Sequence, residues 1–476
     1  MRKNYIPSML IAVLILSGCT GLPGLPLAAT LTPQGTSAAE QTPTVQPTPR
    51  PTEVEQATPT PLPTIDPAPA LKQKIMFWHP WVGQRAAVLN QMVLEYNLSN
   101  PQDITVEVKG WGSETELLAN LALDSQQAPH LVAVSPEYLN PGLIESRDVS
   151  PYFEQPADQL GWTGWQEIPG NLLSAGRNDA QQQVGLPAHL DALVMVYNKT
   201  WATELGFEKS PTTWQDFEDF NCAAAKANNK KSDRKYHGTG GWIIDESPDA
   251  ILTWMSQYGI PLPDTAAQAD FTFQNPELER IFTRIRGLSG SGCAWNARNP
   301  NVDIYFRDRY AMFISLPVSR LEELQESLLA AKSADEWDVI PFPADANPSA
   351  WLPISEYYAI LPSTDGQEMA SWLFMRWLMA PEQELRLALS DGTLPSNRLS
   401  WDAMSQVTSL PQQQKNWMVQ AGDPVVAPHQ AAWIERKRVL QDGFTQAIQA
   451  ATTQEQINNI LQYMDSFFTE IEPSAP

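Results

Sequence analysis

Residues that could perform catalysis are present in the sequence but are scattered along it. The histidines occur singly, and neither a His-Glu-x-x-His helix, a Gly-x-Ser-x-Gly elbow nor a Cys-rich metal-binding spacing is present. The many carboxylates could include a glycosidase pair, but the sequence brings no two of them to the required separation. We therefore expect no catalytic residues, no metal site and no cofactor, although the absence of a motif does not exclude an enzyme.

Polar and aromatic residues follow three predicted strands, at 74–79, 104–108 and 128–135. Helical periodicity over 86–99 and 114–125 separates these strands, so the segment is predicted to be an α/β lobe built from βαβ units. Ligands of open α/β sheets bind outside the carboxyl ends of the strands. The candidate ligand-binding residues at these ends are Trp78, Trp81, Trp111, Ser135 and Glu137.

Tryptophan is unusually frequent, with 17 Trp against 15 Phe and 12 Tyr. Each indole offers a flat apolar face and one N–H donor, a combination that suits the stacking of sugar rings as well as core packing. Trp242, after the glycine-rich turn 238–241, and Trp351 are further candidate stacking residues.

One stretch, residues 184–199, combines a Gly-Pro turn signal with an apolar strand that contains His189 and Asp191 and ends in Tyr-Asn-Lys. It resembles the first interlobe crossover of the extracellular solute-binding proteins that feed ABC sugar importers. In that family, an acid or amide in the crossover lies beside the ligand. The resemblance implies that Asp191 accepts hydrogen bonds from ligand hydroxyls, while the alternative role is a structural acid that caps the hinge.

The resemblance extends over roughly residues 74–470. Residues 305–315 are similar to the segment whose Ala-Met pair precedes a strand returning to the first lobe, although Arg307, Asp308 and Arg309 stand where glycine is usual. Residues 351–360 resemble the third crossover and place Glu356 and Tyr357 near the hinge.

The resemblance implies an α/β, two-lobed periplasmic-binding-protein-like fold with three interlobe crossovers and a ligand cleft between the lobes. The expected first lobe is 71–187 plus 314–356, and the expected second lobe is 188–313 plus 357–476. Lobe closure would bury a mono- or oligosaccharide for delivery to an ABC permease. A cationic ligand such as a polyamine or peptide, or a surface carbohydrate-active enzyme, remains an alternative.

The N-terminus has the features of an export signal. Residues 1–18 combine a basic start with a short apolar run, and Leu16-Ser17-Gly18-Cys19 resembles the lipobox of bacterial lipoproteins. We expect a lipid on Cys19, followed over 19–70 by a disordered Pro/Thr-rich tether. The alternative is an ordinary signal peptide. The expected location is extracytoplasmic, anchored to the cell membrane by the N-terminal lipid.

Charge and cysteine content narrow the partners further. The net charge of −23, from 54 acids and 31 bases, argues against nucleic acid or an anionic membrane surface as partner, and we expect a monomer.

Cys222 and Cys293 remain as an even pair in an exported domain, which predicts a disulfide, with two buried thiols as the alternative.

Overall fold

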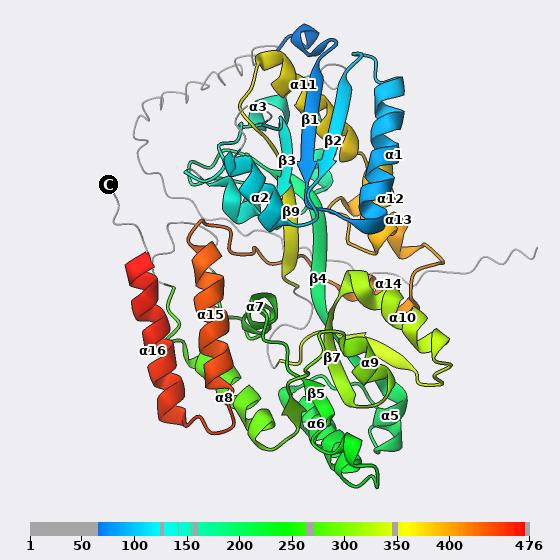
Figure 1. The fold of residues 1–476 in the computed structure, drawn as a ribbon, viewed down its shortest axis with the longest axis vertical. Helices are drawn as coiled ribbons and strands as arrows, with labels where there is room; N and C mark the ends of the chain where they lie inside the picture. The colour runs from blue at the N-terminus through cyan, green and yellow to red at the C-terminus, as the bar shows by residue number, and fades with distance from the viewer. Residues whose placement is uncertain are drawn as a thin grey trace, which may run out of the picture. The chain divides into compact units, whose positions relative to one another are not determined.

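The computed structural model describes residues 65–123, 128–140, 142–153, 155, 160–262, 271–344 and 351–471. Two sheets share one long strand, β4 (Leu186–Asn198) (Figure 1). The first sheet has the order β2-β1-β3-β9-β4. Its other strands are β1 (Lys74–His79), β2 (Thr105–Gly110), β3 (Leu131–Val134) and β9 (Pro353–Ile360).

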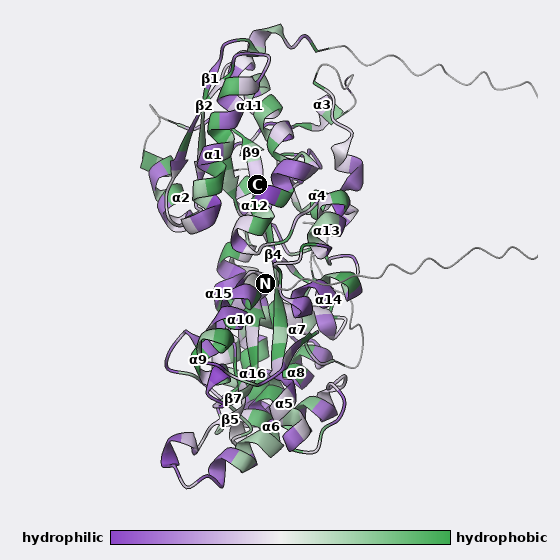
Figure 2. Ribbon diagram, turned by 90° about the vertical axis from the view of Figure 1, so that its right-hand side faces the viewer, coloured by the Kyte–Doolittle hydropathy of each residue, from purple (hydrophilic) through white to green (hydrophobic). Residues whose placement is uncertain are grey.

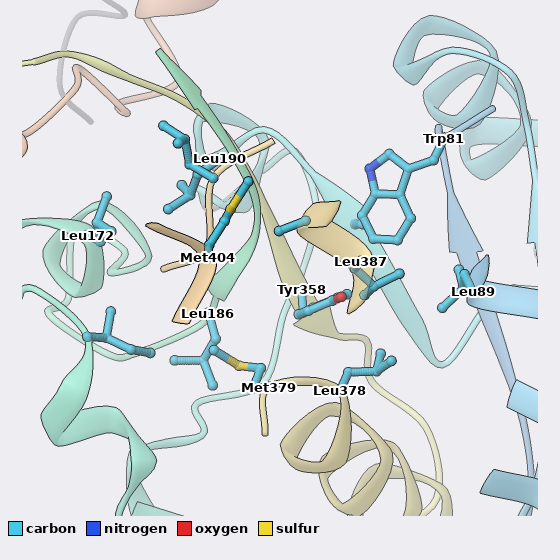
Figure 3. Close-up of a cluster of buried hydrophobic side chains, with 14 of the residues drawn as sticks. Trp81, Leu89, Leu172, Leu186, Leu190, Tyr358, Leu378, Met379, Leu387 and Met404 are labelled. Carbon is cyan, nitrogen blue, oxygen red and sulfur yellow. The ribbon is translucent and has the colours of Figure 1, made fainter. Parts of the chain in front are cut away.

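The βαβ units predicted for the first lobe are confirmed. β1 pairs in parallel with both β2 and β3, and α1 (Gly83–Ser99) and α2 (Glu114–Leu123) connect these strands. α11 (Asp365–Leu378) and α12 (Pro381–Asp391) pack against β1 and α1. Figure 3 shows part of the resulting core, where Trp81, Leu89, Leu387 and Tyr358 lie among other buried side chains.

The second sheet contains the other half of β4 with β7 (Ala311–Pro317), β5 (Gly240–Ile243), β6 (Ala294–Trp295) and β8 (Trp337–Ile340). Gly240 has a φ of 125°, and a Cβ at this position would lie 2.5 Å from the Ala224 carbonyl oxygen. Glycine therefore permits α6 to pack closely against β5. The helices of this lobe include α6 (Trp214–Asn229), α7 (Pro248–Gln257), α8 (Pro276–Gly290), α15 (Trp433–Ala447) and α16 (Gln454–Ile471).

Shorter helices complete the described chain. They are α3 (Ser150–Phe153), α4 (Gly170–Ala175), α5 (Lys199–Glu204), α9 (Val302–Arg307), α10 (Leu321–Ala330), α13 (Arg398–Ser405) and α14 (Gln412–Gln420). Figure 2 shows hydrophobic residues along the strands and hydrophilic residues on many outward turns of the helices. None of the described helices is long and apolar enough to cross a membrane.

β4 is the first passage between the lobes, as predicted. Its residues 186–192 pair with β9 in the first sheet, and its residues 193–198 pair with β7 and β8 in the second. The apolar run from Leu190 to Tyr197 supplies side chains to both lobes, which explains why this strand is hydrophobic along most of its length.

The lobe boundaries expected from the sequence need correction. β7 does not return the chain to the first lobe, because it pairs with β4 and β5 in the second sheet. The return occurs at β9, which pairs with β3. Residues 314–344 therefore belong to the second lobe, and residues 357–405 belong to the first, where α11 and α12 pack.

The third passage lies between α13, which packs on α12, and α14, which packs on β8. The two-lobed fold with three crossovers is confirmed, while its second and third crossovers lie at later positions than the segments we predicted.

The disulfide between Cys222 and Cys293 is confirmed. It joins α6 to the turn before β6, with the two Cα atoms 4.5 Å apart. It links positions 71 residues apart within the second lobe.

The predicted signal peptide, Cys19 and most of the tether lie outside the described residues. The folded part begins earlier than the expected residue 71. Ile65 packs against the core, and Ala68–Ala70 form a 3-10 turn against α11 with Ala70 fully buried.

Candidate functional site

The carboxyl ends of the two sheets meet at the middle of β4. Ala192 is paired with Pro353 at the start of β9, and the next residue, Leu193, is paired with Pro317 at the end of β7. Since β3 runs antiparallel to β9, the carboxyl end of β3 also points towards this junction. The loops after strands of both lobes are thereby brought together, and this is where open α/β sheets place ligands.

One part of the junction is an acidic pocket, defined here by Glu114, Ser135, Glu137, Asp249 and Lys437. A cavity of about 140 Å³ is lined by the last four of these residues together with residues 352–355 of β9 and its approach. Lys437 on α15 forms an ion pair with Glu137, which follows β3, so this contact joins the second lobe to the first. Glu114 lies behind Ser135 and accepts hydrogen bonds from its backbone N at 2.5 Å and its Oγ at 3.0 Å.

Burial perturbs the charges of this acidic pocket. It raises the pKa of Glu114, although the hydrogen bonds from Ser135 act in the opposite direction. Burial also raises the pKa of Asp249, opposed by the positive charge of Lys437 and reinforced by the negative charge of Glu137. Burial opposes the charge on Lys437, but the nearby carboxylates of Glu137 and Asp249 raise its pKa overall.

A second group, the hinge polar cluster, consists of Trp81, Arg85, His189, Glu356 and Asp391. His189 and Glu356 are register partners on β4 and β9, with Nδ1 and Oε2 3.9 Å apart, and Trp81 donates its indole N–H to Glu356. The guanidinium of Arg85 lies 4.4 Å from the centroid of the Trp81 ring. The second imidazole nitrogen of His189 lies 3.9 Å from Asp391, so carboxylates flank both sides of this ring.

The hinge polar cluster is poorly solvated, and its protonation reflects this. Burial raises the pKa of Glu356 to about 7, against the lowering effects of the Trp81 hydrogen bond and the charge of Arg85. Burial and the positive charge of Arg85 hold the pKa of His189 well below its usual value. The side chains of His189 and Glu356 nevertheless remain about one fifth exposed, so both can be reached from solvent.

The carboxylate oxygens of Asp191 accept hydrogen bonds from groups of the protein itself. Its carboxylate accepts hydrogen bonds from Ser319 Oγ at 2.5 Å and from the Ala192 backbone N at 2.8 Å. Only 6% of the residue is exposed. This geometry matches the hinge-capping alternative, in which the acid ties β4 to the segment that follows β7.

Three predicted ligand-binding residues are core residues instead. Trp78, Trp242 and Tyr357 are at most 1% exposed, and each packs within a hydrophobic cluster. A side chain without accessible surface cannot stack on a ligand, so these three are removed from the proposed site. The Tyr357 hydroxyl donates a hydrogen bond to the Leu172 carbonyl oxygen at 2.7 Å, so its buried polar group has a partner within the protein.

The remaining two tryptophans have different environments. Trp111 is half-buried in the loop after β2, where its ring packs edge-on against Trp78. The Lys109 ammonium lies over the Trp111 ring, 3.7 Å from the ring centroid. Trp351 packs with Trp401 and Trp417, and its indole N–H donates to the Gly422 carbonyl oxygen at 2.9 Å. Trp351 therefore packs against the helices on both sides of the third crossover.

Several residues of the two groups were missed from the sequence. Asp249 could have been found by applying the strand-end rule to β5 as well, because it follows that strand within the next loop and helix. Arg85, Asp391 and Lys437 lie on helices far apart in the sequence, and no local pattern distinguishes them from solvated charges.

Two α/β lobes, joined by crossover strands and facing one another with the carboxyl ends of their sheets, define a two-lobed ligand-binding protein. The family described as bacterial extracellular solute-binding protein matches residues 91–415, more than half of the chain. The chain belongs to this family.

Solved structures share the fold at low sequence identity. A cyclic α-maltosyl-1,6-maltose binding protein from Arthrobacter globiformis is 18% identical, with 84% of this chain and 98% of that chain covered and a TM-score of 0.66. The sugar-binding protein MalE from Xanthomonas citri is 17% identical, with 84% and 97% covered and a TM-score of 0.68. The GacH receptor of Streptomyces glaucescens, solved unliganded and with acarbose, is 14% identical, with 85% and 100% covered and a TM-score of 0.65. A search of curated proteins found no match.

Proposed function

We propose that this protein binds a small saccharide between its lobes and delivers it to an ABC permease. Carboxylates from both lobes and aromatic residues of the first lobe converge on the middle of β4, and this arrangement carries the proposal. Glu356 and His189 offer partners for hydroxyl groups, and Trp111, in the loop after β2, offers a half-buried aromatic surface on the first lobe. Saccharides need this combination because their C–H faces pack on rings while their hydroxyls need fixed polar partners.

The comparisons support the same ligand class. The structures that share the fold include proteins described as binding cyclic maltosyl-maltose or acarbose. Family membership supports an extracytoplasmic place of action, and the binding role favours a protein that does not turn over its ligand. We further propose that Cys19 carries a lipid, that the Pro/Thr-rich segment after it acts as a tether, and that the protein works as a monomer.

Thermal unfolding in the presence of candidate ligands tests this proposal. A ligand that binds only the folded state stabilises it by about 2.7 kcal/mol at a concentration 100 times its Kd. We expect one or more mono- or oligosaccharides to raise the Tm. A Tm that rises with spermidine or a basic peptide, and with no saccharide, would establish the cationic alternative instead. Hydrolysis of glycosides that is lost on mutating one acid pair would establish an enzyme.

A further inference from the structure

The acidic pocket contains more negative than positive charge. Glu114 and Asp249 each lie within electrostatic range of Glu137 and of Lys437, which is the cation of this group. The Lys437 ammonium is committed to Glu137, whose residue is only 4% exposed. Glu114 is satisfied by two hydrogen bonds from Ser135.

Asp249 is the carboxylate for which the pocket supplies no direct partner. Among the described residues, no side chain or backbone N–H donates to its carboxylate, and no cation forms an ion pair with it. Its place in the first turn of α7 provides some compensation through the helix dipole. It lines the 140 Å³ cavity together with Lys437, Ser135 and Ser355.

The neighbouring ion pair shows which kind of group this environment accepts. An ammonium, that of Lys437, is already stabilised here by carboxylates, and its pKa is raised despite burial. A second ammonium placed in the cavity would pair with Asp249 and could donate to the hydroxyl groups of Ser135 and Ser355. An ammonium would hold Asp249 in its charged form, whereas a neutral hydroxyl would leave the cost of burying that charge uncompensated.

We propose that the acidic pocket is a subsite for a primary ammonium group, so that the transported saccharide is an amino sugar or an oligosaccharide containing one. This inference rests on the proposed saccharide-binding function and narrows its ligand class. A cavity of about 140 Å³ suits one substituent rather than a whole oligosaccharide, so the sugar ring would lie towards Glu356 and Trp111. Asp249 would then select for the amine.

Calorimetric titration of the full chain with matched saccharides tests the inference. The probes are glucosamine, N-acetylglucosamine and glucose, and the disaccharides chitobiose, in its free-amine form, and cellobiose. We expect the free amines to bind at least tenfold more tightly than their acetylated or hydroxyl counterparts. The variant Asp249→Asn should lose this preference while it retains its affinity for neutral saccharides, because the amide keeps the size of the side chain and removes its charge.

The matched control is Glu246→Gln, on the same loop, whose carboxylate already accepts hydrogen bonds from Thr445 and Asn296. This variant should keep the amine preference. Equal affinity for amines and neutral sugars would contradict the ammonium subsite, and so would a preference for amines that persists in Asp249→Asn. In either case the saccharide-binding function would still stand. If no saccharide of either kind binds the folded protein, the proposed function fails as well.

Discussion

Asp191, in the middle of the first crossover strand, accepts a hydrogen bond from Ser319 Oγ at 2.5 Å. The Ser319 backbone N approaches the same carboxylate at 3.3 Å. Since Ser319 follows β7, this contact fixes the end of a second-lobe strand to the strand that enters the lobe. The acid that the sequence places at the centre of a ligand site therefore has a structural partner.

Replacing Asp191 by Asn should change how stability depends on pH. Burial raises the pKa of Asp191 from 3.8 to about 6, so the folded state holds this proton more tightly than the unfolded state does. The wild type therefore loses up to about 3 kcal/mol of unfolding free energy as pH rises from about 4 to above 6. Asp191→Asn, which can still accept from Ala192 and donate to Ser319, should lack this loss.

Urea denaturation of both proteins at pH 4.5 and pH 8 measures this effect. The Asn variant should gain stability relative to the wild type at the higher pH. A variant that is equally destabilised at both pH values would show that the carboxylate is ionised and required in the folded state.

The ion pair between Lys437 and Glu137 should contribute strongly to stability because Glu137 is buried. Lys437→Gln leaves that carboxylate without its cation, which typically costs 3–5 kcal/mol for a buried pair. The double variant Lys437→Gln, Glu137→Gln should recover most of this loss, since no unpaired charge remains. Denaturant unfolding of the two single variants and the double variant measures the coupling energy between Lys437 and Glu137. If the losses in unfolding free energy of the single variants simply add in the double variant, a stabilising ion pair is contradicted.

Removing the disulfide should destabilise the second lobe. The bond links positions 71 residues apart, for which the chain-entropy estimate is about 4 kcal/mol. Cys222→Ser combined with Cys293→Ser should lower the unfolding free energy by about that amount. Ligand affinity should remain unchanged below the melting transition; weakened binding by the fully folded variant would place the disulfide in the site.

Two tryptophans offer a matched comparison of binding and packing. Trp111→Ala should weaken ligand binding by about two- to tenfold, the 0.5–1.5 kcal/mol typical of a ring contact, with a small effect on stability. Trp242→Ala should instead cost about 3–5 kcal/mol of stability, because its ring is fully buried. Titration calorimetry and thermal unfolding separate the two effects, and a reversed pattern would contradict the assignment.

The sequence predicts the fold well because the features that define it are local. The βαβ units of the first lobe follow from strand and helix periodicity, and the long apolar β4 has a recognisable beginning and end. The second and third crossovers were misplaced because β7 and β9 look alike as short apolar strands. Which sheet each one joins depends on pairing with β5 or β3, far away in the sequence.

The candidate site was harder to predict because it depends on how deeply each side chain is buried, which the sequence does not show. Trp78 and Trp242 occupy strand positions next to the junction, but their side chains point into the cores, where a sequence cannot distinguish them from exposed tryptophans. Lys437 comes from a helix 300 residues away from its partner Glu137. No local sequence pattern predicts that contact.

We propose that a saccharide binds between the lobes beside Glu356. Calorimetric titration of the full chain with saccharides, repeated on Glu356→Gln, tests it most directly. We expect saturable binding with one site per chain for at least one saccharide, and binding at least tenfold weaker in the variant, with little loss of stability. Failure of the folded protein to bind any saccharide, or binding by Glu356→Gln as tight as that of the wild type, would contradict a saccharide site beside Glu356.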